Sequence, residues 1–235
     1  MPRNRLLLLA GAAAAAAIVV VVVVIVAGTG SGTSGTTTTD TTSSTGGPAA
    51  VSTFAGIPQH GDTLGKASAP VTISVFEDPQ CPYCRQWNID TLPTVVENYV
   101  RTGRIKLVYH GIVVIGPNSV NGLRAVYAAG QQNKLWDMVE ALYERQGQEN
   151  SNWITIGVIR NAAREVGAAP ARLITAADSK AVTAQLTQSA KLAESLHVGG
   201  TPTFAIQKTL GPLQQLQVSS LEPGGFTSSL DQALR

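Results

Sequence analysis

This chain of 235 residues contains two cysteines, Cys81 and Cys84, in the stretch QCPYCRQW. Their thiols are side chains that could do redox chemistry. A thiolate is the nucleophile in thiol-disulfide exchange. A helix start favours a thiolate, because its free backbone N–H groups and the positive end of its dipole attract negative charge. Cys84 stands one helical turn after Cys81, within disulfide reach on the same helix face. The spacing predicts an exposed attacking sulfur at Cys81 and a shielded resolving sulfur at Cys84.

The residues alone leave three other uses of the pair open. A structural disulfide gains little from so short a loop, because the entropy that it removes from the unfolded chain grows with loop length. A zinc site needs four ligands, and His60, His110 and His197 stand at no spacing typical of a zinc motif. The third use is a pair of buried thiols without chemistry. Redox exchange is favoured over these, and we expect no metal and no cofactor.

A strand before the pair and a helix after it must position the two sulfurs. VTISVF, residues 71–76, is a short apolar run rich in β-branched side chains and predicts a buried strand. Apolar residues recur at helical spacing over 92–100, where Pro93 should kink the helix. IKLVYH, residues 105–110, predicts a second strand. Strand, helix and strand over about forty residues form a βαβ unit, so these two strands should be parallel.

Helix signals dominate the middle of the chain. Residues 135–143 and 159–166 each carry one apolar face. Pro170 fits the first position of a further helix, and a long stretch of mixed polarity follows it as far as Leu196. We therefore expect a helical block without strands between the second and third predicted strands.

A second motif, VGGTPTF at residues 198–204, comes just before strand character returns. TFAIQ, residues 203–207, and LQQLQ, residues 213–217, flank a turn and predict a hairpin, and GGFTSSLDQALR predicts a short final helix. A generic X–Pro bond is cis in only about 5–6% of cases, so Pro202 taken alone would be assigned trans.

Together these motifs resemble the DsbA-like branch of the thioredoxin superfamily, and most of all the membrane-anchored thiol-disulfide oxidoreductases of Gram-positive bacteria. The resemblance rests on VFEDPQCPYC, the long helix after it, the helical block and GGTPTF ahead of a hairpin, and it covers residues 57–235. It implies that Pro202 is cis and packs against the disulfide. It also implies that Thr201 offers backbone groups to an extended substrate. Tyr83, between the cysteines, is assigned to the same substrate-binding set.

One position departs from the family pattern. Many relatives carry a buried acid six residues before the first cysteine, where it moves protons on and off the second, and here that position is Val75. Glu77 lies two residues further along the strand and therefore on the same face. Glu77 is our candidate for proton transfer, and the alternative is a solvated acid near the strand end. Asp78 is expected to be a turn or capping residue.

Three other side chains have a structural and a functional interpretation. Trp87 could shelter the disulfide or simply belong to the core. His110 and His197 have no partner that the sequence identifies, and we expect both to be structural histidines with satisfied hydrogen bonds.

The expected fold is α/β, a thioredoxin fold with an inserted helical domain, preceded by a transmembrane helix and a disordered linker. The predicted boundaries follow the chain in order: cytoplasmic N-terminus 1–5, transmembrane anchor 6–27, Gly/Ser/Thr linker 28–50, first part of the thioredoxin core 51–110, helical insertion 111–198, and second part of the core 199–235.

The N-terminus indicates where the protein works. The run that begins at Leu6 has no charged side chain and is long enough to cross the hydrocarbon core of a bilayer in a helix. Arg3 and Arg5 precede it, which predicts the N-terminus inside and the rest outside. We favour an uncleaved signal anchor over a cleaved signal peptide, whose apolar region is usually shorter. The predicted location is the cell membrane, single-pass, with an extracytoplasmic catalytic domain.

The predicted function is an extracytoplasmic thiol-disulfide oxidoreductase that introduces disulfides into exported proteins through CPYC. The alternatives are a membrane-tethered disulfide reductase or isomerase, and a non-catalytic thioredoxin-like binding module. A net charge of only +2 argues against nucleic-acid binding. The expected partners are exported protein thiols and a membrane quinone-linked reoxidant of the DsbB or vitamin K epoxide reductase type, and we expect a monomer. Because Tyr83 carries no positive charge where DsbA has His, we predict a weaker oxidant than DsbA.

Overall fold

The computed structural model describes residues 52–235. The predicted cytoplasmic N-terminus, membrane anchor and linker, together covering residues 1–50, lie outside the described residues. Within the described part of the chain, none of the helices combines the length and the apolar character that a membrane crossing requires.

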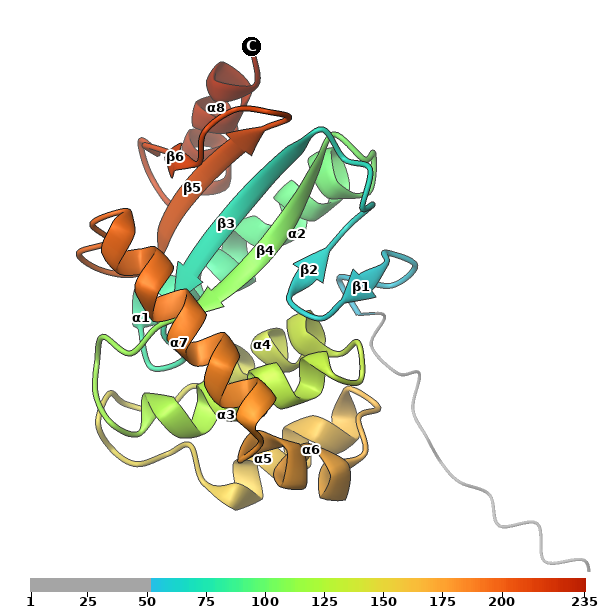
Figure 1. Ribbon diagram of the computed structural model, residues 1–235, viewed down its shortest axis with the longest axis vertical. Coiled ribbons are helices and arrows are strands. Elements are labelled where there is room, and N and C mark those ends of the chain that lie inside the picture. Colours follow the sequence, from blue (N-terminus) through green and yellow to red (C-terminus); the bar gives the residue numbers. More distant parts are fainter. Residues whose placement is uncertain (1–51) are drawn as a thin grey trace, which may run out of the picture. The chain divides into compact units, whose positions relative to one another are not determined.

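A single mixed sheet forms the centre of the described region (Figure 1). Its strands stand in the order β1-β2-β4-β3-β5-β6. Strands β3 and β4 pair in parallel, as the βαβ pattern predicted, and the other neighbours are antiparallel. The strand bounds are β1 Gln59–His60, β2 Thr63–Leu64, β3 Val71–Glu77, β4 Ile105–Gly111, β5 Thr203–Lys208 and β6 Gln214–Gln215.

Both faces of β3 are buried, which explains why its sequence reads as a nearly continuous apolar run. Ile73 and Val75 lie on one face and belong to the main core. Phe76 points to the other face, where it packs with Ala205 and Ile112 in a smaller cluster. The alternation places Glu77 on the same side as Val75.

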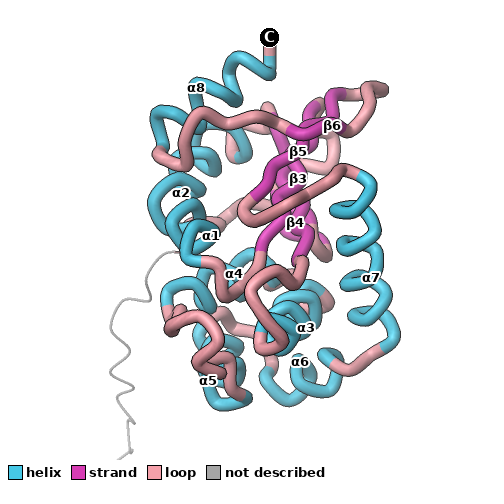
Figure 2. Tube along the Cα trace, turned by 90° about the vertical axis from the view of Figure 1, so that its left-hand side faces the viewer, coloured by secondary structure: helices cyan, strands magenta, loops and turns pink. Residues whose placement is uncertain are grey.

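Helices cover each face of the sheet (Figure 2). The helix after the cysteine pair and the final helix lie on one face, and α7 lies on the other. The helix after the pair changes geometry along its length, with π-helical segments on both sides of α2, the segment that contains Pro93. Bounds on this face are α1 Pro82–Gln86, η1 Trp87–Thr91, α2 Leu92–Val95, η2 Val96–Val100 and α8 Pro223–Leu234.

The helical block lies beyond the carboxyl ends of β3 and β4 (Figure 1). Its core helix α4 is buried along most of its length, and it packs against α3, α5 and η1. The bounds are α3 Ser119–Gly130, α4 Leu135–Glu144, α5 Ile156–Glu165, α6 Pro170–Ala177 and α7 Lys180–Ser195. Pro170 opens α6, as its position predicted.

The structure differs from the sequence-based expectation in three elements. Strands β1 and β2 extend the sheet beyond β4, where no strand was expected. The stretch from Pro170 to Leu196 divides into two helices, because the Ser179 hydroxyl caps a new start by accepting from the Val182 N–H at 3.3 Å. The second hairpin strand pairs only over Gln214–Gln215, shorter than the apolar pattern indicated.

Candidate active site

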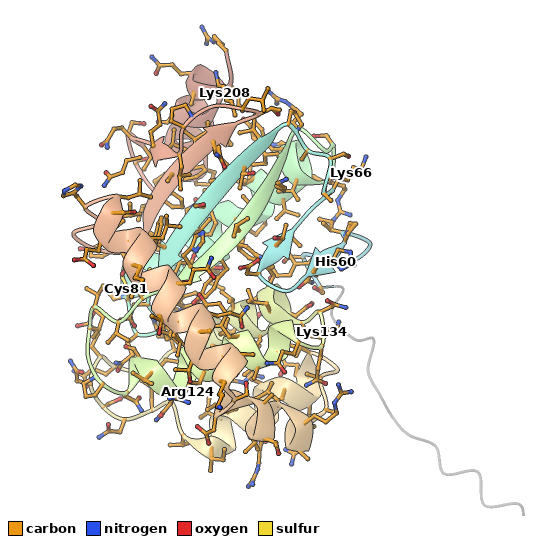
Figure 3. All side chains as sticks on the ribbon, in the orientation of Figure 1. His60, Lys66, Cys81, Arg124, Lys134 and Lys208 are labelled. Carbon is orange, nitrogen blue, oxygen red and sulfur yellow. The ribbon has the colours of Figure 1, made fainter. Side chains whose placement is uncertain are left out.

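The cysteine pair lies where the sheet meets the helical block (Figure 3). Strand β3 ends at Glu77, and Cys81 is the residue that caps the start of α1, with Pro82 in the first turn. The predicted position of Cys81 at a helix N-terminus is therefore confirmed. Both cysteines are free thiols. The expectation that Cys81 is exposed is wrong, because only 3% of the residue is accessible, against 0% for Cys84.

The loop before β5 covers Cys81. Its Thr201–Pro202 peptide bond is cis, as the resemblance implied. The Cys81 Sγ donates to the Thr201 carbonyl oxygen at 3.2 Å. The Thr201 hydroxyl is buried and bonds to no group in the described part of the chain while Cys81 keeps its proton, so it is available to donate to the Cys81 thiolate. Contact with this loop is the physical reason that Cys81 is shielded from solvent.

The surroundings lower the pKa of Cys81 from 9.0 to about 6. The largest cause is a hydrogen bond from the Cys84 thiol, which burial partly opposes. Smaller contributions come from the Thr201 hydroxyl and from the backbone N–H groups of Cys84 and Tyr83. The predicted direction holds, but the neighbouring thiol contributes more than the helix start.

The surroundings shift the pKa of Cys84 in the opposite direction. Burial raises the pKa of this thiol well above its usual value, and Cys81 and the Glu77 charge raise it further. At neutral pH the pair is therefore asymmetric, with a thiolate at Cys81 and a protonated thiol at Cys84. That asymmetry is what an exchange reaction needs, because one sulfur attacks while the other carries the proton.

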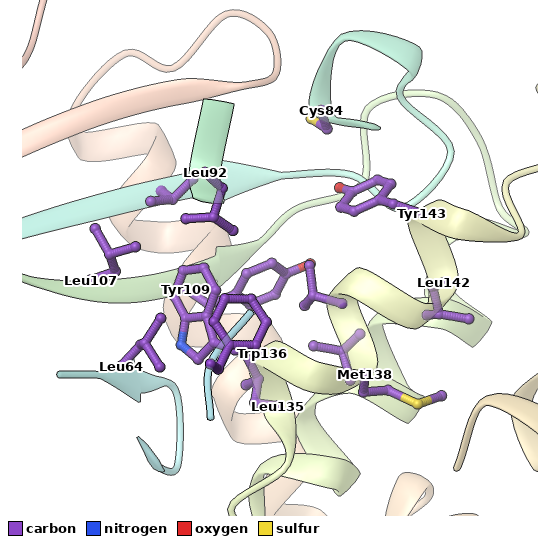
Figure 4. Packing of buried hydrophobic residues seen from close by; sticks show 14 of the residues in the cluster. Leu64, Cys84, Leu92, Leu107, Tyr109, Leu135, Trp136, Met138, Leu142 and Tyr143 are labelled. Carbon is purple, nitrogen blue, oxygen red and sulfur yellow. The ribbon is translucent and has the colours of Figure 1, made fainter. Parts of the chain in front are cut away.

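Glu77 is fully buried, so the solvated-acid interpretation is wrong. Burial raises the pKa of Glu77 to about 8, an effect that hydrogen bonds from Asn88 and Tyr143 oppose. The Asn88 Nδ2 donates to the Glu77 carboxyl at 2.8 Å and to the Cys84 carbonyl oxygen at 3.0 Å. Tyr143 reaches the other carboxyl oxygen from α4, beneath the turn that carries Cys84 (Figure 4). An acid that titrates near neutrality thus lies close to the buried thiol.

Asp78 organises the turn between β3 and α1, which agrees with the structural role expected for it. One carboxylate oxygen accepts from the Gln80 N–H at 2.8 Å and from the Ser119 hydroxyl at 2.6 Å. The other accepts from the N–H groups of Val114 and Ile115, at 2.7 and 2.9 Å. Asp78 therefore fixes the loop after β4 and the start of α3 against the cysteine turn.

Tyr83 differs from its neighbours because 63% of the residue is accessible. Among the residues assigned to the site it is the most exposed, whereas Thr201 and Pro202 are half-buried. Trp87 is fully buried and packs on Phe204 and Phe226, with ring centroids 5.1 and 5.8 Å away. The core interpretation of Trp87 is therefore the one that the structure supports.

Of the two histidines expected to be structural, only His110 has the partly buried, bonded ring that this role requires. His110 Nε2 lies 3.2 Å from the Ser74 hydroxyl, its ring stacks on Phe76, and burial lowers its pKa to about 4. His197 follows the end of α7 in the left-handed region and is exposed. Its backbone carbonyl oxygen accepts from Gln215, but its ring makes no hydrogen bond within residues 52–235, so the satisfied ring expected for it is not found. Among residues 52–235, no group of three or more His, Cys, Asp or Glu side chains is arranged to hold a metal ion.

Asn88 and Tyr143 are site residues that the sequence did not reveal. Asn88 carries a weak local signal, since it lies one turn beyond Cys84 and is buried. Tyr143 carries none, because it reads as one more large residue on the apolar face of its helix. Its contact with Glu77 joins positions 66 residues apart, which no local pattern can show.

Comparison with known proteins agrees with this geometry. Residues 59–216 match the thioredoxin family. The chain is 32% identical over 105 residues to the probable disulfide bond formation protein D of Bacillus cereus, a match that covers 44% of this chain and 49% of that protein. The chain thus spans about half the length of that curated relative.

Two solved structures show the same fold. Oxidised BdbD from Bacillus subtilis superposes with a TM-score of 0.64 at 22% identity, covering 76% of this chain and 97% of that chain. A thioredoxin-like oxidoreductase from Silicibacter pomeroyi gives a TM-score of 0.57 at 30% identity, covering 73% of this chain and 90% of that chain.

Proposed function

The chain belongs to the thioredoxin family, and from this premise we propose that it is a thiol-disulfide oxidoreductase that introduces disulfides into exported proteins. One observation carries the proposal: two cysteines one turn apart have pKa values shifted in opposite directions, down to about 6 at Cys81 and well up at Cys84. A structural disulfide or a pair of inert thiols has no use for that asymmetry. Its relatives named for disulfide bond formation support the same assignment.

The exchange begins with Cys81 and Cys84 joined as a disulfide. A substrate thiolate attacks Cys81 Sγ, so a mixed disulfide forms while the Cys81–Cys84 bond breaks. Cys84 leaves as a thiolate and takes up a proton. A second substrate thiol loses its proton and attacks the first substrate sulfur, which forms the substrate disulfide and releases Cys81 as a thiolate. Two electrons pass from the substrate dithiol to the CPYC pair.

Glu77 supplies the proton that Cys84 needs. A thiolate is costly in this buried position, as the raised pKa of Cys84 shows. Glu77 is protonated at neutral pH, because its pKa lies at about 8, and it has the Cys84 backbone as a neighbour through Asn88. When the pair is reoxidised, Cys84 must lose that proton again before it attacks, and Glu77 takes it back.

Substrate reaches Cys81 along the loop of Thr201 and Pro202. An extended peptide can bond to the backbone of Thr201 as an edge strand does, taking the place of the Cys81 thiol at its carbonyl oxygen, and this brings a substrate sulfur next to Cys81. Tyr83 is exposed beside the pair and provides an apolar ring with a hydroxyl at its edge. The helical block shapes the remainder of this surface.

The setting that we propose is the outer face of the cell membrane. The uncharged run 6–27 behind Arg3 and Arg5 supports an anchor with the catalytic domain outside, where disulfides persist. Each turnover leaves CPYC reduced, so the reaction requires an oxidant. We assign that role to a membrane quinone-linked protein of the DsbB or vitamin K epoxide reductase type, and we expect the chain to act as a monomer.

The reduction potential decides between an oxidase and a reductase. Tyr83 stabilises the Cys81 thiolate through its backbone N–H and adds no positive charge. The protein should therefore be more reducing than DsbA, whose potential is about −120 mV. A glutathione redox titration of the full chain in detergent measures this directly, and a value at or above that of DsbA would contradict the prediction that this protein is the weaker oxidant.

The proposal is tested by trapping the intermediate. Cys84→Ala removes the resolving sulfur, so mixed disulfides between Cys81 and exported proteins should accumulate and disappear on reduction. Cys81→Ala is the matched control, because it keeps one cysteine in the motif and should trap nothing. If Cys81→Ala retains the full phenotype of the wild type, the protein acts as a binding module and the oxidoreductase proposal is wrong.

A further inference from the structure

The orientation of Asn88 defines which oxygen of Glu77 can carry a proton. The Asn88 Nδ2 has two hydrogens, and it directs one at Glu77 Oε1 and the other at the Cys84 carbonyl oxygen. A carbonyl oxygen only accepts, so the amide cannot turn its own oxygen toward Cys84. Glu77 Oε1 consequently faces a donor at all times. The carboxyl proton therefore belongs on Oε2.

Glu77 Oε2 faces the Tyr143 hydroxyl, which has two acceptors and one hydrogen. The Tyr143 oxygen lies 3.1 Å from Glu77 Oε2 and 3.1 Å from the Asp78 carbonyl oxygen. Tyr143 is fully enclosed, with 1% of the residue accessible. A tyrosine hydroxyl donates one hydrogen and also accepts. It can thus serve only one of the two oxygens at a time.

Both protonation states of Glu77 fit this arrangement without movement of a heavy atom. When Glu77 is neutral, Oε2–H donates to Tyr143 and the Tyr143 hydrogen points to the Asp78 carbonyl oxygen. When Glu77 is ionised, the Tyr143 hydrogen turns to Oε2. The Asp78 carbonyl oxygen then keeps the Cys81 N–H as its donor, at 2.9 Å.

We propose that Tyr143 is a positioning residue for the Glu77 proton: its hydroxyl turns between Asp78 and Glu77 as the carboxyl releases and recovers the proton. The inference rests on the proposed function, since it gives Glu77 a means to cycle once per turnover in a closed site. Movement of one hydrogen replaces movement of a buried side chain. Tyr143 thereby links the helical block to the chemistry of the cysteine turn.

The two states of this hydroxyl do not stabilise Glu77 equally. A hydrogen bond to a carboxylate is roughly twice as strong as one between neutral groups. Tyr143 therefore favours the ionised form and holds the pKa of Glu77 below the value that burial alone would give. Without the hydroxyl, Glu77 should release its proton only at higher pH.

Other titratable groups surround Glu77, and the test must separate their effects. No charged partner forms an ion pair with Glu77 among the described residues. The neighbouring titratable groups come from four segments: Cys81 and the α1 thiol Cys84, the β4 hydroxyl of Tyr109, the α4 hydroxyl of Tyr143, and Asp78 in the turn.

The experiment follows Glu77 directly in the full, reduced chain in detergent. Carboxyl-labelled glutamate gives a carbon NMR signal for Glu77, which Glu77→Gln identifies by its loss. The wild-type signal should titrate near the pKa of about 8. In Tyr143→Phe the midpoint should rise by about one pH unit, on the order of tenfold in proton affinity.

Tyr127→Phe is the matched control. It also removes a buried tyrosine hydroxyl, but that hydroxyl bonds to Ser189 and to the Gly111 N–H instead of Glu77. Its Glu77 midpoint should equal that of the wild type. A midpoint in Tyr143→Phe that is unchanged or lower would overturn the proposal.

A second measurement works on the wild type and needs no folded variant. The infrared C–O band of a tyrosine labelled at position 143 alone reports the bonding of this hydroxyl along a pH series. It should shift with the midpoint of Glu77, and a band that stays constant across that midpoint overturns the proposal. Neither measurement uses a substrate, so failure of the exchange reaction would show itself separately, in the trapping experiment.

Discussion

The two cysteines of one short motif lie in two different regions of the molecule. Cys81 faces the loop of Thr201 and Pro202, and its pKa falls to about 6, chiefly because the Cys84 thiol donates a hydrogen bond to its sulfur. Cys84 faces the floor made by Glu77, Asn88 and the helical block, where burial raises its pKa. A helix start alone does not create this difference, because both residues belong to the same helix turn. The difference arises from what each side packs against.

The largest effect is expected from a substitution of Glu77, in the buried surroundings of Cys84. Glu77→Gln keeps the shape of the protonated acid and cannot ionise. The folded-state pKa of Glu77 is raised from 4.5 to about 8, so its stabilising contribution is complete below pH 4.5 and is lost as the pH rises through 8. The reduced variant should therefore gain stability relative to the wild type across that window, by at most on the order of 5 kcal/mol. Urea unfolding at several pH values measures it.

The same substitution should also slow the chemistry. Without an ionisable group at position 77, the proton transfer at Cys84 loses its acid and base, which predicts a fall on the order of 10²-fold in the resolving step. Glu97→Gln makes the same replacement at an exposed glutamate that pairs with Arg101 and serves as the control. If the stability difference between Glu77→Gln and the wild type does not change with pH, the surroundings of Cys84 do not raise the pKa of Glu77.

Whether a feature of the two cysteine environments could be predicted from the sequence depends on how far apart in the chain the contacting residues are. The strands β3 and β4, their parallel pairing and the helix start at Cys81 follow from local patterns and were predicted. The cis bond before Pro202 came from resemblance and not from any local signal. Glu77 was placed on the correct face by alternation, but its burial depends on α4, which packs over it from far along the chain.

The elements that the sequence analysis missed also depend on contacts that no local pattern shows. Strands β1 and β2 have two residues each, too short for any periodicity, and they exist because β4 offers an edge. The break at Ser179 depends on a cap within a stretch whose composition favours helix throughout. The shielding of Cys81 is a property of the loop of Thr201, 120 residues away in the sequence.

A smaller effect is expected from removing the thiol that faces Cys81. Cys84→Ala deletes the strongest hydrogen bond to the Cys81 thiolate, so the pKa of Cys81 should rise from about 6 by about 1 to 2. Thiolate absorbance in the ultraviolet, followed against pH, gives the midpoint. If the midpoint stays near 6, the helix start and not the neighbouring thiol determines the charge of Cys81.

The smallest effect is expected at Thr201, in the loop that covers Cys81. Thr201→Val removes a hydroxyl that lowers the pKa of Cys81 less than the Cys84 thiol does. The midpoint should rise by less than in Cys84→Ala, and the reduction potential should become more negative, because a less stable thiolate makes the reduced form less favourable. Thr187→Val, on the exposed side of α7, is the matched control. A rise at Thr201→Val as large as that at Cys84→Ala would mean that the loop contributes as much to the Cys81 thiolate as the neighbouring sulfur does.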